Sequence, residues 1–157
     1  MIPRSLIEVE IEAEDWTDAI EDVEAVVERA AVAALGSQAG GVVILLTDDE
    51  TVRDLNDRFR GKDRPTNVLS FPAAEMPGAG PQPLGDIVLA YGVCAAEAVE
   101  QSKTLTNHLT HLVVHGVLHL LGRDHEDDAE AEAMEGEERG ILASLGVSDP
   151  YMLPHDG

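Results

Sequence analysis

Three histidines in the C-terminal half of the chain have the type and spacing of metal ligands. His115 and His119 are four residues apart, so on a helix they lie on one face with their Cβ atoms about 5–6 Å apart. Two imidazoles at that separation can bind one cation, each with a ring nitrogen about 2.0–2.1 Å from it. Gly122 favours the left-handed turn that ends many helices, after which His125 can return as a third ligand.

The predicted ligand set is typical of a catalytic rather than a structural zinc. Three imidazoles without a fourth protein ligand leave one coordination position open to water. The ligands add no negative charge, so the metal can lower the pKa of its water to about 7. We therefore expect one zinc ion per chain, although nickel, copper and iron also bind imidazole. The alternative is that these are ordinary hydrogen-bonded histidines, which this spacing disfavours.

The same spacing is similar to the metzincin protease signature, H-E-x-x-H-x-x-G-x-x-H. Gly116 stands where that signature has the glutamate that acts as general base. Hydrolysis of a bond other than a peptide bond is therefore favoured. A glycine inside a helix costs about 1 kcal/mol against alanine, which indicates either a closely packed neighbour or space beside the metal.

Composition favours a single cytoplasmic domain spanning residues 1–157. The 157 residues are 44% hydrophobic but only 3% aromatic, which predicts one aliphatic core. The single cysteine, Cys94, excludes an internal disulfide and fits a reducing compartment. No apolar run approaches about 18 residues, and no signal peptide is recognisable. We expect no membrane association, and a loosely ordered tail from about residue 148.

The charge distribution limits how the chain could bind a polyanion. The formal net charge is −21, which argues against a generic nucleic-acid-binding surface. However, five of the ten basic residues lie within twelve consecutive positions: Arg53, Arg58, Arg60, Lys62 and Arg64. A polyanion could therefore bind only locally, at this segment.

Hydrophobic periodicity predicts an α+β fold with one mixed four-stranded sheet and about five helices. Strands are expected over 6–12, 41–46, 66–71 and 85–91, and helices from Asp15 or Thr17 to Gly36, then over 47–61, 92–101, 103–121 and 126–145. In the second helix, Val52, Leu55 and Phe59 are expected to face inward, behind a Thr47–Glu50 capping box. The metal site would lie on the central helix 103–121 and the following turn. The Pro- and Gly-rich segment 72–83 reads as a loop that could cover it.

Three segments, taken in order, resemble the YbeY family of bacterial endoribonucleases, also called rRNA maturation factors. These are H-G-V-L-H-L-L-G-R-D-H at 115–125, Leu55-Asn56 with Arg60 and P-T-N-V-L-S-F-P at 65–72, and L-G-D-I at 84–87. The resemblance covers roughly residues 45–138. One departure is Arg123, where the family more often has tyrosine.

The resemblance implies a zinc-dependent, single-strand-specific endoribonuclease that acts in ribosomal RNA maturation and ribosome quality control. It implies zinc on His115, His119 and His125, and a catalytic Arg60 in a cleft facing the metal. Expected partners are single-stranded RNA, ribosomal RNA and the ribosome, but neither DNA nor a membrane. Without the resemblance, the residues also allow Arg60 to be an exposed arginine at the end of a helix. Asp124 remains either a helix cap or a group orienting a ligand imidazole. His108 and His111 read as structural or exposed, although His111 shares the helix face of His115 and could form a hydrogen bond near the site.

Two other functions remain open at this point. One is a metal-stabilised ribosome-assembly adaptor with little catalysis of its own. The other is a small metallohydrolase acting on another bond type, such as a peptide or an amide, which Gly116 disfavours.

Overall fold

The computed structural model describes residues 6–36, 40–73, 83–122 and 128–147. The elements in chain order are β1 (Leu6–Ile11), α1 (Asp15–Ala19), α2 (Val23–Leu35), β2 (Gly41–Thr47), α3 (Asp49–Arg60), β3 (Val68–Pro72), β4 (Pro83–Ala90), α4 (Tyr91–Glu100), α5 (Leu105–Leu120) and α6 (Asp128–Ser144). The Pro-rich loop lies largely outside the described residues, as do the tail from 148 and the segment that contains Arg123, Asp124 and His125.

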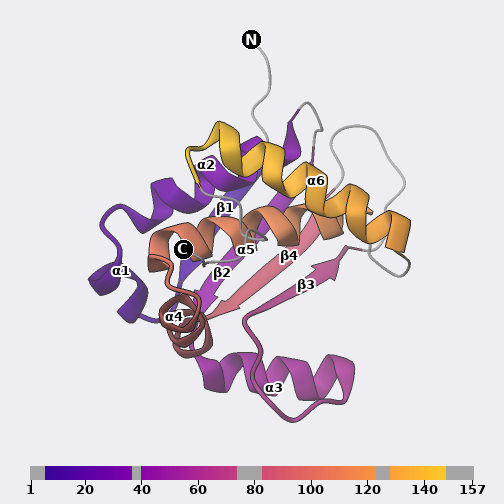
Figure 1. Ribbon diagram of the computed structural model, residues 1–157. Coiled ribbons are helices and arrows are strands. Elements are labelled where there is room, and N and C mark those ends of the chain that lie inside the picture. Colours follow the sequence, from indigo (N-terminus) through magenta and orange to yellow (C-terminus); the bar gives the residue numbers. More distant parts are fainter. Residues whose placement is uncertain (1–5, 37–39, 74–82, 123–127, 148–157) are drawn as a thin grey trace.

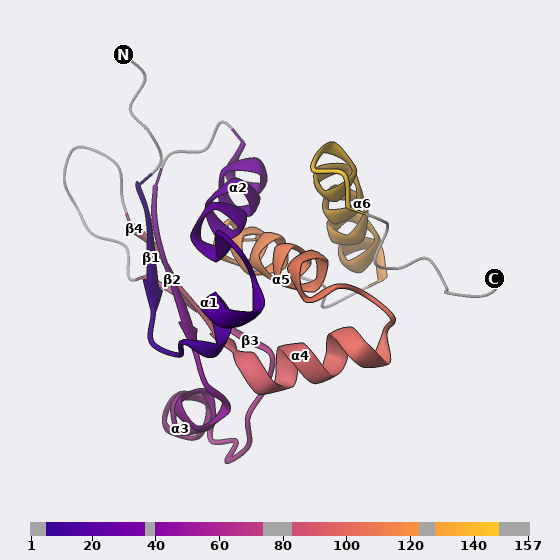
Figure 2. The same cartoon turned by 90° about the vertical axis from the view of Figure 1, so that its left-hand side faces the viewer.

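The four strands form one mixed sheet in the order β1-β2-β4-β3 (Figure 1). β1 pairs parallel to β2 and β2 parallel to β4, whereas β3 pairs antiparallel to β4 and lies at the edge. The predicted fold class is confirmed, with six helices in the described residues instead of about five. Figure 2 shows the sheet nearly edge-on, with α2 and α5 over one face and α6 outside them.

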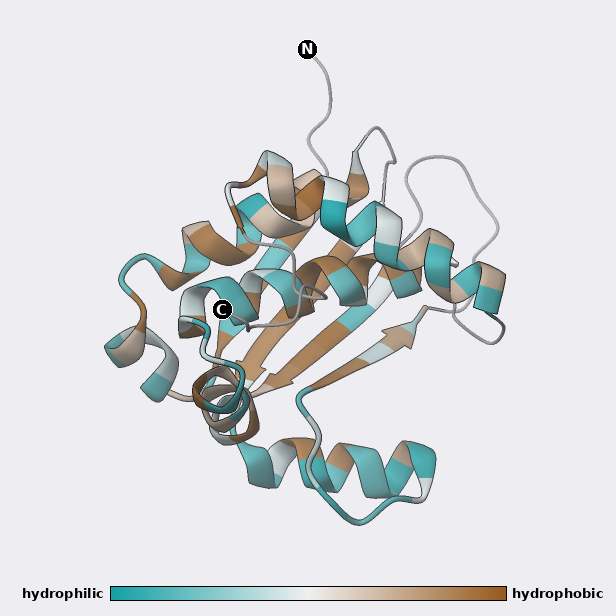
Figure 3. Cartoon of the chain, viewed as in Figure 1, coloured by the Kyte–Doolittle hydropathy of each residue, from teal (hydrophilic) through white to brown (hydrophobic). Residues whose placement is uncertain are grey.

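The sheet is buried unequally on its two faces, because successive strand residues point to opposite sides. Ile44, Ile87 and Leu89 face α2 and α5 and belong to the larger core. Val88 faces the other way and, with Leu69, packs beneath α3 in a second, smaller cluster. The hydrophobic strands are visible as the brown centre of Figure 3. None of the helices in the described part of the chain is long and apolar enough to cross a membrane.

The first predicted helix is two helices. Ile20 is extended (φ −128°, ψ 118°) and Asp22 is left-handed (φ 54°), which separates α1 from α2. The break lets the fully buried Trp16 donate its indole N–H to the Thr47 carbonyl at 3.0 Å. Periodicity could not reveal it, because Trp16, Ile20 and Val23 keep helical spacing across the break.

The predicted inner face of α3 is partly wrong. Phe59 is 66% exposed, whereas Val52 and Asn56 are buried. A polar residue, Asn56, occupies this inward position because it forms hydrogen bonds with the chain that follows the helix. Its Nδ2 donates to the Arg64 carbonyl at 2.8 Å, and its own carbonyl accepts from the Lys62 N–H at 3.2 Å.

The cap of α3 also differs from the predicted box. Asp48 is the N-cap, and its Oδ1 accepts from the Thr51 N–H at 2.8 Å. This bond holds the pKa of the Asp48 carboxyl below its usual value. Thr47 is instead buried, and its hydroxyl donates to Glu12 at 3.0 Å, which ties β2 to the end of β1.

Candidate metal centre

Helix α5 carries the candidate ligands and lies between the sheet and α6 (Figure 2). It begins at Thr104, whose hydroxyl accepts from the Asn107 N–H at 3.1 Å. Its apolar side is buried in the larger core, and four histidines follow one another along another side: His108, His111, His115 and His119. The helix ends before Gly122, which has φ +93° as its predicted role in the turn requires.

The structure brings together two of the three predicted ligands. The Nε2 atoms of His115 and His119 lie 3.0 Å apart, and the rings are nearly perpendicular at 77°. Two nitrogens bound to one tetrahedral ion lie about 3.3 Å apart, so the pair is close to chelating geometry. His125 lies outside the described residues, so the three-histidine set stays a prediction.

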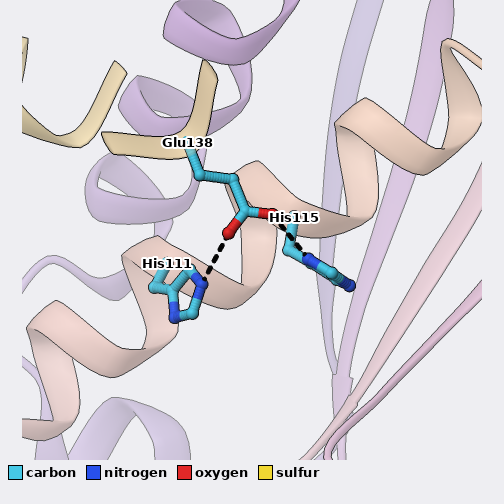
Figure 4. Close-up of side chains that lie close together, drawn as sticks. All are labelled: His111, His115 and Glu138. Atoms are coloured by element: carbon cyan, nitrogen blue, oxygen red, sulfur yellow. Dashed lines mark hydrogen bonds and ion pairs between the residues drawn. The ribbon is translucent and has the colours of Figure 1, made fainter. Parts of the chain in front are cut away.

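A residue that sequence analysis missed, Glu138 of α6, joins two of these histidines (Figure 4). Its carboxylate is fully buried. One oxygen lies 2.8 Å from His115 Nδ1 and the other 3.0 Å from His111 Nε2. Glu138 therefore fastens α6 across α5 at the level of the candidate ligands.

The Glu138 contact selects the His115 tautomer that a metal requires. An ionised Glu138 carboxylate would only accept hydrogen bonds, so His115 Nδ1 would carry the proton donated to it across their 2.8 Å contact. The Nε2 atom, which lies 3.0 Å from His119 Nε2, would then be the unprotonated nitrogen that a metal can bind. A ligand histidine commonly donates its other N–H to a carboxylate in this way, which fixes the ring and raises its basicity.

A second donor set is geometrically possible. The candidate ligand atoms of His111, His115 and Glu138 all lie within 4.8 Å of one another. A cation there, however, would have to displace two hydrogen bonds of 2.8 and 3.0 Å, whereas a cation between His115 and His119 would displace only their one contact at 3.0 Å. The Glu138 carboxylate is also fully buried, whereas His119 is partly exposed. The His115–His119 pair, supported by Glu138, fits a metal open to substrate better.

Gly116 lets the metal helix approach the sheet. A Cβ at this position would lie 3.0 Å from Ile87 Cδ1 and 3.1 Å from Ile87 Cγ2. Real Cβ contacts are rarely so short, so alanine would force Ile87 to move. This supports the first of the two readings of Gly116, a closely packed neighbour.

Arg60 lies at the end of α3 beside the edge strand. Its Nη2 donates to the Ser70 carbonyl at 2.7 Å, and its guanidinium is 5.4 Å from the centre of the Phe71 ring. In the sheet, Ser70 pairs with Ile87, which packs beneath Gly116. Two strands thus connect Arg60 to the helix that carries His115. The catalytic assignment of Arg60 stays a prediction.

His108 is structural, as one reading of the sequence predicted. It is buried, and its Nε2 lies 2.9 Å from Glu97 Oε1, which also accepts from Asn67 at 3.0 Å. Burial lowers the pKa of His108 despite the opposing effect of Glu97. Cys94 is a buried core residue, and burial raises the pKa of its thiol.

Fold and site together define an α/β protein with a histidine-based candidate metal centre on its central helix. The sequence model of the family described as Endoribonuclease YbeY matches residues 6–146, and the chain belongs to this family. The predicted resemblance is thereby confirmed.

Relatives named "Endoribonuclease YbeY" match nearly the whole chain. The protein from Azorhizobium caulinodans is 52% identical, with 96% of this chain and 99% of the relative covered. The protein from Paramagnetospirillum magneticum is 53% identical, with 92% and 94% covered. The solution structure of TM1509 from Thermotoga maritima shares the fold, with a TM-score of 0.55 and 24% identity over 97% of this chain and 99% of that one.

Proposed function

We propose that the protein is a metal-dependent endoribonuclease that cleaves single-stranded RNA, and that ribosomal RNA is its substrate. Membership of the Endoribonuclease YbeY family supports the reaction class. The observation that carries the metal dependence is the convergence of His115 Nε2 and His119 Nε2 at 3.0 Å. Maturation and quality control of ribosomes, with the ribosome as partner, are the roles that the resemblance implies. A cytoplasmic protein is consistent with its one free cysteine, Cys94.

His115 and His119 would hold the metal through Nε2, and His125 would be the third ligand. Zinc is the proposed ion, one per chain, because a set of imidazoles suits it. When bound, it would supply a Lewis acid and lower the pKa of bound water. Glu138 would keep His115 in the tautomer whose Nε2 can bind the metal. Because residue 116 is glycine, that position supplies no glutamate to act as general base.

Arg60 would bind the phosphate that reacts. A guanidinium offers paired N–H donors to phosphate oxygens, and such bonds strengthen as negative charge develops in the transition state. In the structure one of its nitrogens already donates to Ser70, which holds the side chain at the edge strand. Arg60 would therefore be positioned before RNA arrives.

The direct test is incubation of the purified protein with single-stranded RNA, with and without a chelator, followed by re-addition of zinc. We expect cleavage that the chelator abolishes and zinc restores. RNA left intact by the metal-loaded protein would overturn the proposal and favour the adaptor. Cleavage of peptides or amides alone would favour the other metallohydrolase.

Replacing Arg60 by alanine should lower RNA cleavage by about 10²–10³-fold, the usual effect of removing one donor to a developing oxyanion. The metal content, measured by atomic emission, should stay near that of the wild type. Arg53→Ala is the matched control, because Arg53 lies on the same helix but pairs with Asp63 at 2.7 Å. Full activity of Arg60→Ala would refute its catalytic role.

Replacing Glu138 by glutamine should weaken metal binding by about 10–100-fold, the usual effect of losing a group that orients a ligand. The amide can accept from one histidine but presents its NH₂ group to the other. Competition with a chelating dye measures the affinity without reference to activity. Glu132→Gln, an exposed position on the same helix, should leave it unchanged. Equal affinity in both variants would show that Glu138 only packs α6 onto α5.

A further inference from the structure

Both phenylalanines of the chain meet at its surface. The rings of Phe59 and Phe71 are 5.4 Å apart in an edge-to-face arrangement. Phe59 is 66% exposed. The other described aromatic residues, Trp16 and Tyr91, instead pair with each other against the core. The exposed ring is therefore a specific feature of α3 in a chain that is poor in aromatic residues.

The exposure of Phe59 is not required by the packing of α3. Val52 fills the contact with the smaller core, and Asn56 occupies the next inward position. A phenylalanine at the surface forgoes the stabilisation that its burial would give. The exposed part of the Phe59 ring, which contacts Phe71, is accessible to a ligand.

A cation lies on the same aromatic surface. The Arg60 guanidinium is 5.4 Å from the centre of the Phe71 ring, within the range of a cation–π contact. Its bond to the Ser70 carbonyl, 2.7 Å long, holds it there. Phe59, Phe71 and Arg60 thus form a continuous aromatic–guanidinium surface, here called the stacking platform.

The charge of the chain segment that carries Phe59 and Arg60 is opposite to that of the whole protein. Residues 58–64 hold four basic residues and one acidic residue in a chain of net charge −21. Arg53 and Arg58 are paired with Asp63 and Asp54. Within the described ranges, by contrast, Arg60, Lys62 and Arg64 take part in no ion pair. These cations, at the end of α3 or directly after it, are therefore available to an anionic ligand.

We propose that the stacking platform binds one or two unpaired bases of the RNA substrate, while Lys62 and Arg64 bind the adjacent phosphates. Aromatic rings and guanidinium planes stack on exposed bases, and positive groups beside them follow the backbone. A duplex covers its base faces, so only single-stranded RNA can use such a surface. The inference rests on the proposed function, for which it supplies a binding site and a reason for single-strand preference.

The platform is connected to the metal helix through the edge strand. Ser70, which fixes Arg60, pairs with Ile87, and Ile87 lies against Gly116 beside His115. The outer edge of β3 carries no further strand in the described sheet. An RNA strand stacked on the platform would therefore pass this edge toward the candidate metal centre.

Binding of two oligonucleotides tests the platform. The probes are a 2′-O-methyl oligoadenylate, checked for integrity afterwards, and an abasic oligomer with the same number of phosphates. We expect the metal-loaded wild type to bind oligoadenylate about 5–150-fold more tightly than the abasic oligomer, as stacking of one base implies. Phe59→Leu should bring this ratio close to one and leave the abasic affinity unchanged.

Two variants complete the test. Phe59→Trp should keep the preference for bases, and its fluorescence should be quenched by oligoadenylate. Val99→Ala, at a position 80% exposed on α4, should behave as the wild type. An unchanged ratio in Phe59→Leu, or no preference for bases in the wild type, would overturn the platform. These readouts do not depend on cleavage, so a failure of the proposed enzymatic function would be seen separately.

Discussion

Replacing His115 by alanine should abolish metal-dependent RNA cleavage. His115 contacts both His119 and Glu138, at 3.0 and 2.8 Å. Its loss would remove one candidate ligand and the His115 contact of the buried Glu138 carboxylate. A metal that stabilises transition-state charge contributes several kcal/mol, and about 4 kcal/mol corresponds to about 10³ in rate.

Two measurements separate this effect from general damage to the fold. Cleavage of single-stranded RNA and metal content should both fall in His115→Ala, to the level of the chelator-treated wild type. His111→Gln is the matched control, since His111 also bonds Glu138 but lies on its other side, 3.0 Å from Oε1. It should keep the metal and most of the activity. Stoichiometric metal and full cleavage in His115→Ala would contradict the assignment.

Replacing Gly85 by alanine should have the largest effect on stability, lowering the free energy of unfolding by about 3–5 kcal/mol. Gly85 has φ +147°, which side-chain-bearing residues rarely adopt. A Cβ there would overlap the Phe71 carbonyl oxygen and would lie 2.9 Å from Leu120 Cδ2. Gly85 lies where β3, β4 and the end of α5 meet, so the energetic costs of backbone strain and of steric overlap add.

Urea denaturation followed by circular dichroism measures this difference. Gly136→Ala is the control, because a Cβ at that position in α6 meets nothing within 4 Å. It should raise the free energy of unfolding by about 0.5–1 kcal/mol, as alanine does in a helix. A Gly85→Ala protein as stable as the wild type would mean that β4 does not approach β3 and α5 as closely as the structure shows.

Periodicity and local motifs predicted the features of this chain that depend on neighbouring residues. A four-residue spacing was enough to place His115 and His119 on one face of α5. Alternating and continuous apolar residues predicted the four strands, and Gly122 predicted the end of α5. The family resemblance added the reaction class, which no local pattern carries.

Features that depend on distant contacts were not predicted. Glu138 lies among many acidic residues, and its residue type does not distinguish it from them. Glu138 lies four residues after Met134 and four before Leu142, both of which are buried. This spacing was the available sequence signal that Glu138 also faces inward. Phe59 was wrongly placed in the core because hydrophobicity suggested burial. The inward role of Asn56 arises from hydrogen bonds to the loop after α3, which no helical pattern reveals.

The most direct test of the central claim is the ¹⁵N spectrum of the histidine side chains in zinc-loaded protein. We predict that Nε2 of His115 and Nε2 of His119 bind the ion, that His115 Nδ1 keeps the proton donated to Glu138, and that His111 is not a ligand. Zinc bound to His111 and His115 with loss of that proton would instead assign the metal to the His111–His115–Glu138 cluster and would contradict the account.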